Sequence, residues 1–225
     1  MSYSSCLKFV VLLNVLLMFV SCTQDNASGS GSEIVSIPTP TPEARVLPAD
    51  KKWVRIFFRE IDGRIEGSDI GPLREKKLLP GEKEVRIWVG FDLYPLNGII
   101  LRQNEGKWTG SYVLPVKLSS SSKPITALRE PKSGWNALWQ RLEELDFYTL
   151  PDSEDIGATN AGTDAKGAVI EIKTKESYRT YMYGGLRTPE ADETKKVVEI
   201  CRTLSREFGV DLFEGPERVG IRDGP

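Results

Sequence analysis

The stretch that decides the fold is a pair of apolar runs joined by a turn: Gly98-Ile-Ile-Leu-Arg102, then Asn104-Glu-Gly106, then Lys107-Trp-Thr-Gly-Ser-Tyr-Val113. Apolar runs on both sides of a short glycine-containing turn are typical of a β-hairpin. The segment 85–91, Val-Arg-Ile-Trp-Val-Gly-Phe, shows the same strand pattern. We therefore expect three strands in this part of the chain.

The segment before these strands, Trp53-Val-Arg-Ile-Phe-Phe-Arg-Glu60, also alternates. Val54, Ile56 and Phe58 fall on one face, which predicts a further strand. The dipeptide Asp62-Gly63 predicts the turn that ends it. Prolines and a glycine flank the basic run Arg74-Glu-Lys-Lys77, and this composition predicts a surface loop between the first two strands.

The hydrophobic period changes after the serine run 119–122. Trp135, Leu138, Trp139, Leu142 and Leu145 follow the spacing i, i+3, i+4, i+7 and i+10. This spacing predicts an amphipathic helix, with Ser133 as its N-cap. The serine run, near residues 119–125, either divides two subdomains or belongs to one long loop.

The last third of the chain predicts a hairpin and a second helix. After a loop rich in Asp, Gly, Ser and Asn, the segments 168–173 and 178–183 have strand patterns. A helix is predicted from Pro189 to Phe208, because Thr188 can cap it and Gly209 can end it.

Strands followed by a helix, a hairpin and a helix predict an α+β fold: a mostly antiparallel sheet with two amphipathic helices packed on it. The globular domain is expected at residues 53–215, since all tryptophans lie beyond residue 52. Residues 216–225 are expected to form a frayed tail. No characterised domain family is recognised in residues 53–225.

Composition argues against several classes of function. The 225 residues include 30 Lys and Arg against 32 Asp and Glu, and this balance argues against nucleic-acid binding. Without histidine there can be no Ser-His-Asp triad, Cys-His dyad or imidazole-bound metal. Three cysteines are too few for a multi-disulfide scaffold or a four-cysteine metal site. We therefore expect no cofactor, no metal ion and no catalytic residues.

The first 21 residues have the pattern of a signal peptide. Lys8 precedes a run at 9–20 that only Asn14 interrupts, and this run is shorter than the ~20 residues that span a bilayer. It ends in Phe19-Val-Ser-Cys22, which resembles the lipobox of bacterial lipoproteins over residues 1–22. The resemblance implies that residues 1–21 are removed and that Cys22 is acylated.

The same resemblance implies a location in the cell envelope. Thr23 follows the cysteine, where an Asp would resemble an inner-membrane retention signal, so the outer membrane or cell surface is expected. Residues 22–52 contain Ser-Gly and Pro-Thr repeats and predict a flexible tether. Such a tether would lift the domain on the order of 30 Å from the bilayer.

The candidate ligand-binding residues are Arg179, Tyr181 and Tyr183, which strand alternation places on one face. An arginine beside two tyrosines can stack on and hydrogen-bond a planar, anionic or sugar-like ligand. The alternative is structural, because tyrosines are also favourable strand residues.

Other candidates also have structural alternatives. Trp135 and Trp139 are either core residues or a carbohydrate-binding shelf, and Cys201 is expected to be a buried apolar residue. Three polar groupings complete the set: the acidic loop with Asp152, Glu154, Asp155 and Asp164, the Ser120/Lys123 pair, and the carboxylate pairs Glu60/Asp62 and Glu143/Glu144. They would serve a cation site, a serine nucleophile and a carboxylate hydrolase, respectively.

The sequence thus favours a lipid-anchored cell-envelope protein with a soluble, non-enzymatic binding domain. Its partners would be the membrane, through the lipid on Cys22, and another envelope protein or an envelope polymer. The alternative is an envelope hydrolase that uses carboxylates or a Ser/Lys pair. A structural protein with no specific ligand is the third hypothesis.

Overall fold

The structure is a computed structural model that describes residues 52–115, 125–158 and 166–213. Its elements are α1 (Lys52–Ile65), the short 3₁₀ helix η1 (Leu73–Glu75), β1 (Lys83–Phe91), β2 (Tyr94–Asn104), β3 (Lys107–Val113), β4 (Ile125–Leu128), α2 (Trp135–Glu144), β5 (Gly167–Thr174), β6 (Tyr178–Tyr183) and α3 (Asp192–Phe208). Several predictions concern residues outside the described ones: the signal peptide, Cys22, the tether up to residue 51, the Ser120/Lys123 pair, Asp164 and the frayed tail.

In the described part of the chain, six strands form one sheet at the centre of the fold, in the order β4-β3-β2-β1-β5-β6. Every neighbouring pair of strands is antiparallel. The predicted α+β class is therefore confirmed, and so are the two hairpins, β2–β3 and β5–β6. Strands from both sides of residues 116–124 belong to this sheet.

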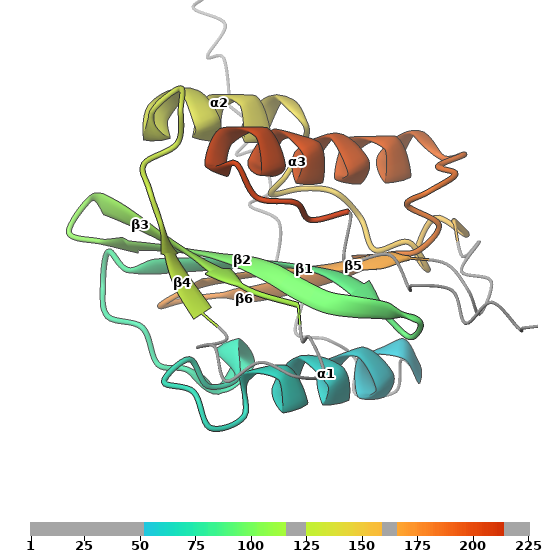
Figure 1. The fold of residues 1–225 in the computed structure, drawn as a ribbon, viewed down its shortest axis with the longest axis horizontal. Coiled ribbons are helices and arrows are strands. Elements are labelled where there is room, and N and C mark those ends of the chain that lie inside the picture. The colour runs from blue at the N-terminus through green and yellow to red at the C-terminus, as the bar shows by residue number, and fades with distance from the viewer. Residues whose placement is uncertain (1–51, 116–124, 159–165, 214–225) are drawn as a thin grey trace, which may run out of the picture. The chain divides into compact units, whose positions relative to one another are not determined.

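Helices cover both faces of the sheet (Figure 1): α2 and α3 lie on one face and α1 lies on the other. Two separate hydrophobic clusters result. The larger one packs the sheet residues Val85, Ile87 and Leu101 against apolar residues of α2 and α3. The smaller one packs Trp88 and Ile100 against α1.

The prediction of a strand at 53–60 is wrong, because this segment belongs to α1. The buried residues are Trp53, Phe58, Ile61 and Ile65, whose spacing of three to five residues follows one face of a helix. Ile56, expected on the apolar face of a strand, is half exposed. Among the described residues, three α-helices therefore pack on the sheet, where two were expected.

Two predicted helix starts are also wrong. The N-cap of α2 is Gly134, with φ of 80°, and not Ser133. The backbone N–H of Ser133 donates to a side-chain oxygen of Glu207, which ties the start of α2 to the end of α3. Helix α3 begins at Asp192 after an extended Ala191, three residues later than predicted, but it ends at the expected Gly209.

One close approach fixes the contact between β1 and β2. Gly98 pairs with Trp88 across the two strands, and the indole of Trp88 lies where a side chain of Gly98 would be. A Cβ atom on Gly98 would come within 2.6 Å of the Trp88 ring. The missing side chain therefore makes room for a fully buried tryptophan.

Within the described part of the chain, no helix combines the length and the apolar character needed to cross a membrane.

Candidate functional site

An aromatic cluster joins β3, α2 and α3 at one end of the larger core. The ring of Trp108 on β3 lies 4.3 Å from that of Trp139 and 6.0 Å from that of Trp135, centroid to centroid. Trp135 in turn packs on Phe208, at 5.8 Å. Because these residues come from two helices and a strand, their positions are fixed by the packed core.

The two tryptophans of α2 have different surroundings. Trp139 is only 9% exposed and packs among core residues. The interpretation of this tryptophan as a core residue is therefore confirmed. Trp135 and Trp108 are only partly buried, and they stack at an interplanar angle of 23°. The four-residue spacing on α2 therefore separates one core residue from one residue near the surface.

Trp108 and Trp135 line a surface groove of about 710 Å³, which we call the tryptophan groove. Its walls come from the β2–β3 turn, the loop before α2 and the first turn of α2, and they comprise Gly106, Lys107, Trp108, Glu130, Ser133, Gly134, Trp135, Asn136 and Ala137. The polar members Lys107, Glu130, Ser133 and Asn136 are all exposed.

Backbone groups add to the polar character of this groove. The N-cap Gly134 provides no side-chain hydrogen bond to the first turn of α2. The first N–H groups of any helix lack an acceptor within the helix, and those of Trp135, Asn136 and Ala137 belong to residues that line the groove. The groove thus combines indole rings with hydrogen-bond donors and acceptors around them.

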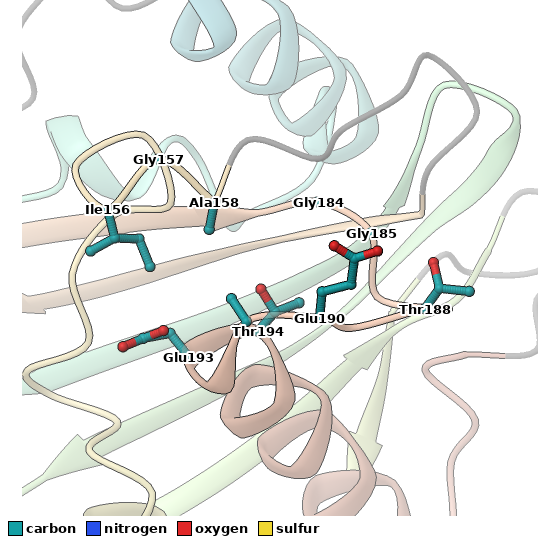
Figure 2. A pocket seen from close by; sticks show the side chains of 10 residues that line it. Ile156, Gly157, Ala158, Gly184, Gly185, Thr188, Glu190, Glu193 and Thr194 are labelled. Carbon is teal, nitrogen blue, oxygen red and sulfur yellow. The ribbon is translucent and has the colours of Figure 1, made fainter.

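A second pocket, of about 440 Å³, lies where β6 ends and α3 begins (Figure 2). The segment 156–158 and Gly184-Gly185 form part of its wall, and it is bordered by Glu190, just before α3, and by Glu193 in the first turn of α3. Acidic residues at a helix N-terminus are stabilised by the helix dipole. The charge of this pocket therefore has a structural explanation.

The three residues predicted as a ligand-binding face lie at the edge of the larger core. Tyr181 and Tyr183 are fully buried. Their hydroxyl groups donate to the carbonyl oxygens of Phe147, at 2.8 Å, and Pro151, at 2.7 Å. Burial raises the pKa of both tyrosines, so their hydroxyls stay protonated as donors.

Arg179 acts on the same loop as these tyrosines. Its guanidinium donates to the carbonyl oxygens of Tyr148, at 2.6 Å, and Leu150, and it lies over the Tyr181 ring. The three side chains share one face of β6, as strand alternation predicted. In this geometry they hold the loop after α2 against the sheet, and a ligand-contacting role for them stays a prediction.

A buried polar network, which the sequence reasoning missed, lies on the α1 face of the sheet. Arg86 is fully buried and donates to Glu84, at 2.9 Å, and to the carbonyl oxygens of Ile70 and Gly71. Lys76 and Arg102 also pair with Glu84. Burial disfavours the charge of Glu84, but these three cations outweigh it and lower its pKa.

Glu171 extends this network across the sheet, since it lies directly opposite Arg86 in the register of β5 and β1. Trp88 and Tyr178 donate to its two carboxylate oxygens, at 2.7 and 2.8 Å. Burial nevertheless raises the pKa of Glu171. The alternation of β1 contains a signal for this network, because the charged residues Glu84 and Arg86 alternate with apolar ones. The sequence does not show that α1 and the loop around η1 cover these charged residues.

The remaining candidates have structural surroundings. Asp152 is buried and accepts hydrogen bonds from the backbone of Glu154 and Met182, at 3.0 and 3.1 Å, so it connects its loop to β6. Asp62 forms an ion pair with Arg74, which attaches α1 to the loop around η1. Glu60 is half-buried in α1, and Glu143 and Glu144 are exposed on α2.

Cys201 is fully buried in the larger core, as expected, and burial raises the pKa of its thiol to about 12. A thiol in this state is unreactive. Among residues 52–115, 125–158 and 166–213, no group of three Cys, Asp or Glu side chains is placed to hold a metal ion.

The fold and the groove define a class: an α+β domain with helices on both faces of an antiparallel sheet and an aromatic groove at one end. Comparison with known protein families, curated proteins and solved structures found no match to this chain.

Proposed function

We propose that this chain is a lipid-anchored protein of the cell envelope, and that its α+β domain is a binding module whose ligand occupies the tryptophan groove. One observation supports the binding role of the groove: Trp108 and Trp135 remain partly exposed, and exposed polar side chains surround them. Aromatic side chains surrounded by a few polar groups are the usual composition of a binding surface.

The groove is also well placed on the scaffold. Trp108 belongs to a strand and Trp135 to a helix, so both rings are held by rigid elements rather than by loops. The loop before α2 is fixed to α3, because the backbone N–H groups of Lys132 and Ser133 donate to Glu207. A preorganised surface loses little conformational entropy when a ligand binds.

The anchor is supported by the N-terminal sequence, in which Cys22 follows closely after the apolar run at residues 9–20. Each buried methylene of an acyl chain contributes about 0.8 kcal/mol, so several chains on one cysteine hold a protein firmly at a bilayer. The tether that follows would keep the domain close to envelope ligands, and such proximity raises their effective concentration.

The anchor is tested by metabolic labelling of cells with a clickable fatty acid. We expect the wild-type chain to carry the label and the Cys22→Ser variant to carry none, because the thiol is the acceptor of the lipid. Cys6→Ser serves as the matched control and is expected to keep the label. A label that persists in Cys22→Ser would refute the anchor.

The groove is tested by photo-crosslinking in intact cells. A photoreactive amino acid at Asn136, which lines the groove, is expected to give a specific crosslinked product. The control position is Lys175, an exposed residue between β5 and β6 that does not line the groove. Equal products from both positions, or none from Asn136, would refute the groove as the binding surface.

A further inference from the structure

We infer that the ligand of the tryptophan groove is an oligosaccharide chain of the cell envelope. This inference rests on the proposed function and specifies the chemical class of its ligand. It starts from the two kinds of surface that meet in the groove: the indole rings of Trp108 and Trp135, and the exposed polar side chains around them.

A sugar ring offers both kinds of surface to its partner. Its C–H groups form an apolar face that packs on an aromatic ring, and its hydroxyl groups project from the edge. In the groove, Asn136 and Ser133 lie beside Trp135 and provide amide and hydroxyl groups for such an edge. First-turn backbone N–H groups of α2 are further donors for hydroxyl oxygens.

The shape of the groove favours a chain over a compact small molecule. Its volume of about 710 Å³ is open to solvent, whereas the pocket at the start of α3 is smaller and more enclosed. Small-molecule sites usually bury most of their ligand. An open groove instead allows a polymer to continue beyond the residues that contact it.

The chemistry of the rim argues against other occupants. Lys107 and Glu130 contribute one charge of each sign, so the groove does not select a polyanion. An amphipathic helix would need a continuous apolar groove. Among the described residues, the large hydrophobic side chains that are exposed are Ile56, Leu79, Leu93 and Ile156, and none of them lines the tryptophan groove.

The inference is tested with the detergent-solubilised full-length chain and two sets of defined oligosaccharides, β-1,4-linked N-acetylglucosamine and β-1,4-linked glucose. Binding is measured by calorimetry and by the change in tryptophan fluorescence. We expect at least one set to bind, with affinity that increases with chain length up to the length of the groove. Trp135→Ala is expected to weaken this binding about three- to tenfold, the value of one aromatic contact.

Two further variants separate a binding effect from a folding effect, because Trp135 also packs on Phe208. Trp135→Phe keeps an aromatic ring and is expected to restore most of the affinity. Ala137→Gln adds bulk to the exposed groove wall without removing a core residue, and it is expected to weaken binding while the thermal unfolding midpoint stays unchanged.

Two outcomes would overturn the inference: neither oligosaccharide set binds at millimolar concentration, or binding is unaffected by Trp135→Ala and Ala137→Gln. If crosslinking at Asn136 then yields a protein partner, the proposed binding function stands and only the ligand class is wrong. If crosslinking at Asn136 also fails, the groove itself is not the binding surface.

Discussion

The two faces of the sheet are built in different ways. On the α2–α3 face, the buried sheet positions of β1 are Val85, Ile87 and Val89, and they pack against helical apolar residues. On the α1 face, the same strand presents Glu84, Arg86 and Trp88, all of them buried. One nine-residue strand therefore serves an apolar core on one side and a charged network on the other.

The difference reflects what covers each face. Two amphipathic helices supply enough apolar surface to close the first face. The second face is covered by α1 and by the loop around η1, whose backbone carbonyls at Ile70 and Gly71 need buried donors. Arg86 supplies them, and Glu84 compensates its charge. The polar network is thus the means by which an irregular loop can pack on a sheet.

The largest expected effect tests this network. Arg86→Met should reduce the free energy of unfolding by about 3–5 kcal/mol, because it leaves two loop carbonyls without their donor and removes the one fully buried cation that pairs with Glu84. Urea denaturation measures it. The control is Arg102→Met: Arg102 pairs with the same Glu84 but its side chain is 39% exposed, so a loss below about 1 kcal/mol is expected. Similar losses in both variants would show that burial does not distinguish them.

A smaller effect of opposite sign is expected at Asn97, which departs from the apolar pattern of the α2–α3 face. Its side chain is fully buried opposite Val89, and neither its amide nitrogen nor its oxygen has a hydrogen-bond partner in the described structure. Asn97→Leu should therefore stabilise the fold by about 1–2 kcal/mol in urea denaturation.

The counterpart of Asn97 on the α1 face is Thr180, whose buried hydroxyl also lacks a partner in the described structure. Thr180→Val should gain up to about 1 kcal/mol, since a single polar atom is removed. If Asn97→Leu instead destabilises the protein, a bound water satisfies the amide of Asn97. The apolar character of the α2–α3 face would then be limited to the centre of that face.

The smallest effect is a dependence of stability on pH, and it has opposite signs for the two buried carboxylates, Glu171 and Glu84. Burial raises the folded pKa of Glu171, so its contribution to stability falls as pH rises from the unfolded value of about 4.3 through the folded value. For Glu84 burial is outweighed by Arg86, Lys76 and Arg102, and the folded pKa is lowered. Its contribution is present above pH 4.3 and is lost as pH falls through the folded pKa.

The measurement compares urea unfolding of Glu171→Gln and Glu84→Gln with wild type between acidic and neutral pH. Relative to wild type, the first variant should gain stability as pH rises and the second should lose it. If the free energy of unfolding, relative to wild type, changes with pH in the same direction in both variants, the pKa values of Glu171 and Glu84 are not shifted in opposite directions.

Local pattern predicted most of the fold but failed at α1. In the hairpins and in α2, the spacing of the apolar residues matches the strand or helix that forms, and tertiary packing does not override it. In 53–60, aromatic and β-branched residues satisfy both a two-residue and a helical period, so the sequence alone does not choose. Asp62-Gly63 then suggested a turn, whereas Asp62 in fact pairs with Arg74 from a helical position. A tertiary contact overrides the local preference.

The candidate site was less predictable, because its parts are distant in sequence. The helical spacing marked Trp135 and Trp139 as one stripe, but it could not show that Trp108 of β3 stacks on Trp135. That contact depends on how α2 lies over the sheet. Likewise, strand alternation places Arg179, Tyr181 and Tyr183 on one face. It does not predict that their donor groups bind the backbone carbonyls of the loop after α2.

The close approach of Trp88 and Gly98 constrains how this sequence can change over evolutionary time. Any side chain at position 98 would collide with the indole, and a smaller residue at position 88 would leave a hole and remove the donor to Glu171. Neither site can drift alone without loss of stability. Among divergent homologues the two positions should therefore change together, and an alanine at 98 should be accompanied by a reduced ring at 88.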